Sequence, residues 1–277
     1  MPSDDAGAYH LGYSDAEAER LIRQGRYING MTEQFFRSSG VESGQRVLDV
    51  GSGVGEVALI LSTLVGPSGE IAGVERDGRS IERARARLQD AGVHNVEFVE
   101  ADITAFSTDT LFDAVVGRYV LQFLPDPVAA LRSLSAMVKP GGIIAFQEAS
   151  FAPFVALSDH LPLRSTCVRL MRDMAVQSGV RTEMGPELYK AFQDAGLPAP
   201  AMRFDMPLGR DPEFTRLLSD RLVIALQDAK RHRRSMEALG DPNTLADRLR
   251  EEIERSNSVV PWIALVGASC RKHVTPV

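Results

Sequence analysis

A glycine-rich turn that follows an acidic residue is the segment of this chain best suited to holding a ligand. The run Asp49-Val50-Gly51-Ser52-Gly53 comes after a short apolar stretch and before a helical one. Glycines let the backbone pass close beneath a ligand, and a helix start offers unpaired N–H groups. The Asp49 carboxylate would repel a pyrophosphate on this turn. It suits a ligand that has a cationic amino group and no phosphate.

Two further acidic residues follow predicted strands. Glu75 ends the segment 70–75, the position at which an acid in a Rossmann unit accepts hydrogen bonds from both hydroxyls of a ribose. Asp102 follows the segment 96–100 and could accept a hydrogen bond from an adenine amino group. A surface acid and a loop-capping aspartate are the structural alternatives for these two residues. Since ligands bind at the carboxyl ends of parallel strands, we expect Asp49, Glu75 and Asp102 to lie together.

The segments around these residues alternate between two periodicities. We predict strands at 46–50, 70–75, 96–100, 112–117 and 143–148, and helices at 56–65, 79–91 and 126–138. Strands that alternate with amphipathic helices indicate a parallel sheet with helices on both faces.

The flanking segments are predicted to be mainly helical. Ser14 and Glu17 form a capping-box pattern for a helix over 14–39, which we expect to break near Gly25 or Gly30. Later helices are predicted at 156–178, 186–195, 212–239 and 244–255, with strands at 201–206 and 259–270. The predicted organisation is an N-terminal helical cover (1–39), a core (40–150), a helical lid insertion (151–198) and C-terminal strands and helices that complete the sheet (199–277).

The order of these motifs resembles a known family. Residues 47–55 resemble the first signature of class I S-adenosylmethionine-dependent methyltransferases, 73–77 their acidic second signature and 101–103 their adenine-contacting third. Residues 112–116, 124–127 and 138–142 are similar to the UbiE-like, type 11 subgroup. The resemblance covers roughly residues 40–150. It implies a Rossmann-like three-layer α/β sandwich, with a seven-stranded, mostly parallel sheet, an antiparallel last strand and a helical lid.

The resemblance also implies the cofactor, S-adenosyl-L-methionine, and a role for each matching residue. Asp49 would hold the amino group of the cofactor, Glu75 the ribose, and Arg76 would stack near the adenine. The remaining cofactor contacts fall on Gly51, Ser52 and Gly53 at the methionine part, on Asp102 and Ile103 at the adenine edge, and on Gly117 and Arg118 near the methyl group. Arg118 departs from the small or polar residues frequent there, and could pair with the cofactor carboxylate or with an acidic group of the substrate.

Methyl transfer from a sulfonium chiefly needs an acceptor that is close, aligned and desolvated, so a dedicated base is optional. Glu148, at the end of the predicted fifth strand, and His160, in the predicted lid, are the candidate catalytic residues, each with a structural role as its alternative. An apolar acceptor pocket is expected in the lid, formed by some of the residues Phe151, Phe154, Leu157, Leu161, Leu163, Met171 and Met174.

Composition limits the remaining options. The net charge is −6 over 277 residues, which argues against nucleic-acid binding, and no apolar run is long enough for a transmembrane helix. Two cysteines and five histidines make a disulfide framework and a metal site improbable, and a cytoplasmic enzyme is expected. We therefore predict an enzyme with a small, partly hydrophobic substrate, methylated at oxygen, carbon or nitrogen, and leave a homodimer open. The alternatives are an RNA methyltransferase using the basic run 230–234, an NAD(P)-dependent oxidoreductase, and a non-catalytic partner-binding protein.

Overall fold

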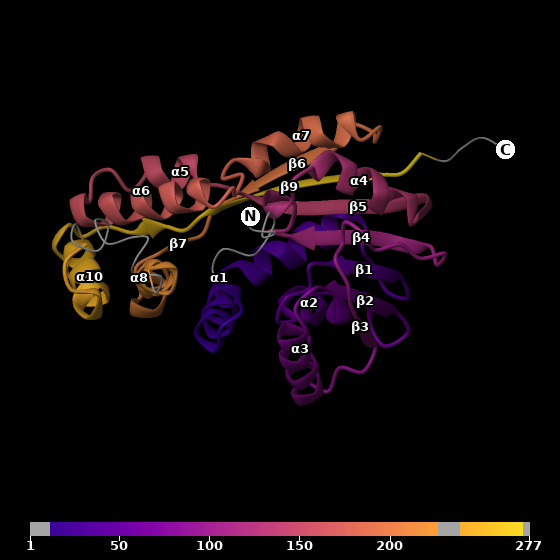
Figure 1. The fold of residues 1–277 in the computed structure, drawn as a ribbon, viewed down its shortest axis with the longest axis horizontal. Coiled ribbons are helices and arrows are strands. Elements are labelled where there is room, and N and C mark those ends of the chain that lie inside the picture. The colour runs from indigo at the N-terminus through magenta and orange to yellow at the C-terminus, as the bar shows by residue number, and fades with distance from the viewer. Residues whose placement is uncertain (1–11, 227–238, 274–277) are drawn as a thin grey trace, which may run out of the picture.

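The computed structural model describes residues 12–226 and 239–273, and a seven-stranded sheet runs through its centre (Figure 1). The sheet order is β3-β2-β1-β4-β5-β9-β6. Neighbouring strands from β3 to β5 are parallel, whereas β9 is antiparallel to both β5 and β6. The strands are β1 (Arg46–Val50), β2 (Glu70–Glu75), β3 (Val96–Glu100), β4 (Phe112–Arg118), β5 (Val138–Ser150), β6 (Ala201–Asp205) and β9 (Ala264–Arg271). The predicted Rossmann-like sheet with an antiparallel last strand is confirmed.

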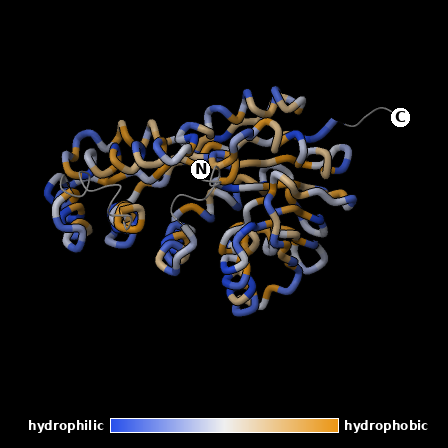
Figure 2. The backbone as a smooth tube through the Cα atoms, in the orientation of Figure 1, coloured by the Kyte–Doolittle hydropathy of each residue, from blue (hydrophilic) through white to orange (hydrophobic). Residues whose placement is uncertain are grey.

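Helices cover both faces of the sheet and complete the three layers. One face carries α1 (Asp15–Ser39), α2 (Glu56–Val65) and α3 (Gly78–Asp90), and the other carries α4 (Pro127–Ala136) and α7 (Met184–Asp194) (Figure 1). Because successive strand side chains point to opposite faces, Val47 packs with α1 and α2 while Leu48 packs with α4 and α7. Apolar stretches accordingly follow the strands in Figure 2.

Helix α7 was predicted to belong to the lid, and the structure corrects this. Its residues Met184, Leu188 and Phe192 are buried in the same apolar cluster as Phe146 of β5 and Ala268 of β9. A helix with an apolar face of this kind is stable only when that face packs against another element, and here that element is the sheet. Segment 184–194 is therefore part of the sandwich.

Helix α1 begins as predicted but does not break. The Ser14 side chain accepts a hydrogen bond from the backbone N–H of Glu17 (3.2 Å), and the helix ends at Ser39, before Gly40. Gly25 and Gly30 both lie inside it. A Cβ atom at Gly25 would lie 2.1 Å from Glu56 Oε2, so this glycine allows α1 to pack closely on α2. The predicted break is wrong, because Gly25 is required by the close packing of α1 on α2 and not by a turn.

A second group of helices lies beyond the carboxyl end of β5 (Figure 1). It contains α5 (Ala152–Ala156), α6 (Pro162–Gln177), α8 (Pro212–Ala225) and α10 (Leu245–Arg255), together with the short strands β7 (Leu208–Gly209) and β8 (Val260–Pro261). The four helices and β8 share one apolar cluster that includes Trp262, and β7 pairs with β8; we call all these elements the helical lobe. The single helix predicted over 156–178 is interrupted, because Pro162 starts a new helix after residues 157–161.

Two predictions fall at the limits of what the structure describes. The basic run 230–234 lies outside the described residues, as does the second half of the helix predicted over 212–239. Within 12–226 and 239–273, no helix is long and apolar enough to cross a membrane.

Candidate functional site

A cavity of about 290 Å³ lies where the carboxyl ends of the parallel strands meet the first half of α1. It is lined by the turn after β1, the ends of β2 and β4, the loop after β3 and the segment 12–24. Eight of the residues predicted to bind the cofactor line it: Gly51, Ser52, Gly53, Glu75, Arg76, Asp102, Ile103 and Arg118. These residues are up to 67 positions apart in the sequence, and the parallel sheet brings them to one edge.

The glycine turn lies directly against the cavity. Gly51 and Gly53 have φ angles of 67° and 52°, in the left-handed region that favours glycine. A Cβ atom at Gly51 would lie 2.7 Å from Val120 Cγ2, whereas one at Gly53 would have only the Gly51 carbonyl oxygen nearby, at 4.0 Å. Gly51 is therefore required by the neighbouring loop, and Gly53 leaves the backbone open to a ligand.

Glu75 holds this turn in place. Its Oε2 accepts a hydrogen bond from Gly53 N–H (3.0 Å), and its Oε1 accepts from the N–H groups of Arg76 (2.9 Å) and Asp77 (3.1 Å). The side chain is 8% exposed and lines the cavity. A carboxylate has about four lone-pair positions, so these bonds leave capacity for a ribose hydroxyl.

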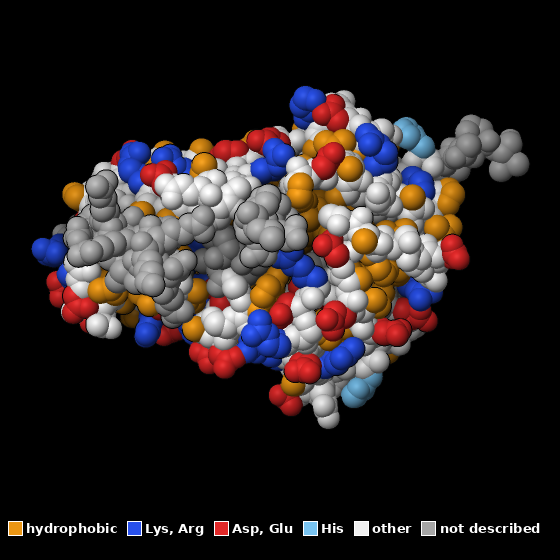
Figure 3. Space-filling view, in the orientation of Figure 1, with side chains coloured by type: hydrophobic (Ala, Val, Ile, Leu, Met, Phe, Trp, Pro, Cys, Tyr) orange, Lys and Arg blue, Asp and Glu red, His pale blue; other side chains and the backbone are white. Residues whose placement is uncertain are grey.

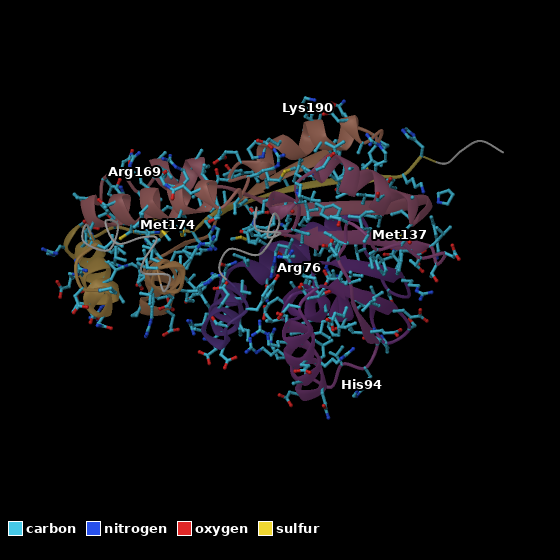
Figure 4. All side chains as sticks on the ribbon, in the orientation of Figure 1. Arg76, His94, Met137, Arg169, Met174 and Lys190 are labelled. Carbon is cyan, nitrogen blue, oxygen red and sulfur yellow. The ribbon has the colours of Figure 1, made fainter. Side chains whose placement is uncertain are left out.

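Asp102 and Arg76 form the outer end of the cavity. Asp102 Oδ1 accepts from Thr104 N–H (2.8 Å) and Oγ1 (2.7 Å), and these hydrogen bonds lower the pKa of its carboxyl group. Arg76 Nε donates to the hydroxyl of Tyr13 (2.8 Å), whose ring lies 6.0 Å from the guanidinium. Figure 4 shows Arg76 beside α1, far from Met174 in the helical lobe. The N-terminal segment therefore closes over the cavity at Arg76.

Asp49 is near the carboxyl end of β1, just before the turn; it is fully buried and does not itself line the cavity. Neither of its carboxylate oxygens has a hydrogen-bond partner among the described residues. Burial raises the pKa of this carboxyl group to about 8, partly opposed by the positive charge of Arg118. An uncompensated buried carboxylate is costly and indicates a missing cationic partner. The amino group of S-adenosylmethionine is such a partner, so the site fits this cofactor.

Arg118 and Gly117 differ in what they contribute. Arg118 Nη1 donates to Asn29 Oδ1 and Thr32 Oγ1 of α1, both at 2.9 Å, and the side chain lines the cavity. Gly117 is buried and does not line the cavity. A Cβ atom there would lie 2.6 Å from the Phe146 ring. The absence of a side chain allows β4 to pack closely on Phe146 of β5, and Gly117 pairs with Val50 of β1, next to the glycine turn.

Glu148 does not line the cavity, although it was predicted to act there. It is fully buried, and Oε1 accepts hydrogen bonds from the N–H groups of Val120 (3.0 Å) and Leu121 (2.8 Å) while Oε2 accepts from Gln122 N–H (3.2 Å). Burial raises the pKa of this carboxyl group to about 7. The carboxylate holds the start of the 3₁₀ helix η1 (Leu121–Phe123), which lies at the end of β4. The geometry therefore supports a positioning role rather than proton transfer.

Replacing Glu148 by Gln is expected to lower the free energy of unfolding by about 1–3 kcal/mol, because the amide cannot accept all three hydrogen bonds and buried donors lose their partners. Urea denaturation at pH 8 measures this loss. The exposed Glu254, changed to Gln, is the matched control and should leave stability unchanged. Equal stability of Glu148→Gln and the wild type would contradict the positioning role.

His160 and the apolar lid residues lie elsewhere than predicted. His160 is exposed and its Nε2 lies 3.2 Å from Ser258 Oγ, outside the cavity. Of the seven apolar residues named for the pocket, Phe151 alone lines the cavity; Leu157 is 51% exposed, and the others pack in or against the core of the helical lobe. Periodicity predicts a buried face but not its neighbour, and here the neighbours are α8 and α10.

The sequence analysis predicted α1 as a cover but did not identify the polar residues that α1 and α8 bring to the cavity. Glu17, Arg20 and Gln24 of α1 are almost fully buried charged or polar residues that line the cavity, joined there by Arg221 of α8. Their spacing on α1 shows that they share one helix face, which is the signal that could have identified them. Among the described residues, no cluster of three or more His, Cys, Asp or Glu side chains could hold a metal ion.

Comparison with known proteins agrees with this geometry. The profile of a family described as a methyltransferase domain matches residues 41–196, more than half of the chain. The chain therefore belongs to the methyltransferase-domain family, and its core is that of an S-adenosylmethionine-dependent methyltransferase.

Individual relatives cover less of the chain. The ubiquinone/menaquinone biosynthesis C-methyltransferase UbiE of Pseudomonas putida is 40% identical over 114 residues, which are 40% of this chain and 44% of that protein. The solved [4+2]-cyclase SpnF has a TM-score of 0.55 at 20% identity, covering 88% of this chain and 80% of that one. A SAM-dependent methyltransferase from Aquifex aeolicus has a TM-score of 0.51 at 18% identity, covering 70% and 91%. These two structures show a shared fold.

Proposed function

We propose that this protein transfers a methyl group from S-adenosylmethionine to an oxygen, carbon or nitrogen atom of a small, partly hydrophobic organic acceptor. The observation that carries the proposal is the buried carboxylate of Asp49, without a hydrogen-bond partner among the described residues, just before a glycine turn and at the same sheet edge as Glu75 and Asp102. The match to the methyltransferase-domain family and the similarity to UbiE support it.

Each residue of the edge has a place in this proposal. Asp49 holds the amino group, Glu75 a ribose hydroxyl, and Asp102 with the backbone of Ile103 the adenine edge. Arg76 stacks near the adenine, and Arg118 pairs with the methionine carboxylate or with an acidic group of the acceptor. Gly51, Ser52 and Gly53 pack against the methionine part.

When bound, the cofactor supplies a methyl group already activated on a sulfonium. The protein then has to align the acceptor, exclude water and, where the acceptor loses a proton, leave a path for it. Segment 12–24 and the loop after β4 both line the cavity, which serves the first two needs. Neither Glu148 nor His160 reaches the cavity, so proximity and orientation carry the catalysis we propose.

The alternative functions have less support. A dinucleotide would place its pyrophosphate on the turn after Asp49, where a buried carboxylate is unfavourable. On the face shown in Figure 3, Lys and Arg side chains are interspersed with Asp and Glu over the described residues, which differs from the basic stripe typical of an RNA-binding surface. A non-catalytic binding protein would have no need of the cofactor residues.

Isothermal titration calorimetry with S-adenosylhomocysteine is the direct test. We expect saturable binding by the wild type and none of comparable strength for NADH or NADPH. Absence of heat with S-adenosylhomocysteine at millimolar concentration, from a folded sample, would overturn the cofactor assignment. A screen of small acceptors that detects released S-adenosylhomocysteine then tests turnover.

The cellular setting is part of the proposal. We propose that the protein acts in the cytoplasm on a small molecule and does not bind nucleic acid. Light scattering would test whether it forms a homodimer. The net charge of −6 and the free cysteines Cys167 and Cys270 support a reducing compartment and argue against a phosphate-rich partner.

A further inference from the structure

One end of the cavity is not accounted for by the cofactor motifs. It is formed by α1, the loop after β4 and α8, and its polar residues include Glu17, Arg20, Gln24, Tyr119, Gln122 and Arg221. Arg20, Gln122 and Arg221 are 0%, 6% and 8% exposed. Burying so many polar groups is costly unless they meet a polar ligand or each other.

Two of these side chains point to a ligand. The hydroxyl of Tyr119 and Oε1 of Gln122 are buried and have no hydrogen-bond partner among the described residues. Tyr119 also has a φ of 58°, an unfavourable backbone conformation for a tyrosine. The three hydrogen bonds to Glu148 hold the following residues, so this loop presents Tyr119 and Gln122 in a defined position.

Three guanidiniums lie near the Tyr119 hydroxyl. The guanidiniums of Arg20, Arg118 and Arg221 act on the Tyr119 hydroxyl. Arg20 is neutralised by Glu17, whose two carboxylate oxygens accept hydrogen bonds at 2.6 and 2.7 Å. Glu148 is an acidic group that also acts on the Tyr119 hydroxyl, and its oxygens accept hydrogen bonds from the backbone of the loop. Arg221, from α8, places a guanidinium near a phenol that can donate a hydrogen bond.

The rest of this end is apolar. Ala149 and Phe151 from the end of β5, Val180 and Ile263 line the same cavity. A ligand that fits here combines an apolar body with an oxygen anion. Guanidinium and phenol groups together suit a carboxylate, because the fork of an arginine matches its two oxygens.

We propose that the methyl acceptor is a carboxylic acid with an apolar body and an O–H or N–H group. Its carboxylate binds Arg221 and the Tyr119 hydroxyl, while its O–H or N–H donates to Gln122. This proposal rests on the proposed methyltransferase function, because it uses the part of the cavity next to the cofactor residues.

The test measures binding of defined probes to protein saturated with S-adenosylhomocysteine. The probes are phenylacetate, 4-hydroxyphenylacetate, 4-aminophenylacetate and 4-hydroxyphenylacetamide. We expect the affinity for the 4-hydroxy acid to be about tenfold higher, or more, than the affinity for its amide. The better-binding of the 4-hydroxy and 4-amino acids should also have a higher affinity than phenylacetate. Which of the two substituted acids binds better distinguishes an O–H from an N–H donor.

Three variants assign the contacts. Arg221→Met should remove the preference for the acid over the amide. Tyr119→Phe deletes only a hydroxyl and should weaken acid binding, so it provides the test if Arg221→Met does not fold. Gln122→Met should reduce the affinity of the substituted acids to that of phenylacetate. Arg216→Met is the matched control, because Arg216 lies on α8 with an exposed side chain and should leave all affinities unchanged.

Several results would overturn the inference. These are equal binding of acid and amide, no binding of any acid at millimolar concentration, or a preference that survives Arg221→Met and Tyr119→Phe. Weaker binding of S-adenosylhomocysteine by Arg221→Met would show that these groups hold the cofactor carboxylate instead. A wild type that binds S-adenosylhomocysteine without an acid preference contradicts only this inference, whereas one that does not bind it contradicts the proposed function.

Discussion

Replacing Asp49 by Asn is expected to weaken S-adenosylhomocysteine binding tenfold or more and, at the same time, to stabilise the ligand-free protein above pH 8. The loss of affinity follows from removing a charged acceptor of the ligand ammonium, a bond of about 1.5–3 kcal/mol. The gain in stability follows because the wild-type carboxylate is buried without a hydrogen-bond partner, and the neutral amide avoids the cost of burying that charge.

The pH dependence of this variant has a defined sign. Burial raises the pKa of Asp49 from 3.8 to about 8 in the folded protein. A group with a raised folded pKa contributes stability that is fully present below its unfolded pKa and is lost as the pH rises through the folded value. Wild-type stability should therefore fall relative to Asp49→Asn from about pH 4 to pH 8.

Ligand binding reverses this effect in the wild type. A bound ammonium favours the carboxylate and lowers the pKa of Asp49, so binding below pH 8 should release a proton. Calorimetry in buffers of different ionisation heat measures that release. Asp49→Asn should remove this contribution, while the exposed Asp109, changed to Asn, should retain it. Proton release that is identical in Asp49→Asn and the wild type would place the amino group of the ligand elsewhere.

Replacing Glu75 by Ala is expected to reduce cofactor affinity by about 1.5–3 kcal/mol, because a ribose hydrogen bond to a charged acceptor is lost. The same variant should lose a smaller amount of folding stability, because Gly53, Arg76 and Asp77 lose the acceptor of their N–H groups. Calorimetry and urea denaturation measure the two effects separately.

A modified ligand tests whether Glu75 contacts the ribose itself. The wild type should bind an S-adenosylhomocysteine analogue that lacks the ribose 2′-hydroxyl less tightly than the natural compound, and Glu75→Ala should bind the two almost equally. Glu70 lies on the same strand with an exposed side chain, and Glu70→Ala should behave as the wild type. A Glu75→Ala variant that still discriminates between the ligands would show that another residue recognises the ribose.

The local sequence determined the Rossmann core and its cofactor edge. Asp49, Glu75 and Asp102 each come at or just after the carboxyl end of a strand, and parallel strands bring their carboxyl ends together whatever the loops do. The left-handed turn at Gly51 and Gly53 also follows from residue type, since only glycine adopts those angles without strain. Such features depend on neighbours within a few positions or on a general rule of topology.

Only the tertiary structure decided the roles of Glu148, Tyr119 and Arg221. Glu148 and the loop it holds are 26–28 positions apart, and Arg221 reaches the cavity only because α8 packs against α1. A strand-end acid can point into a cleft or cap a neighbouring loop, and its own sequence context is the same in both cases. Which one occurs depends on where unpaired N–H groups of a distant segment come to lie, because a buried carboxylate is stable only where such donors reach it.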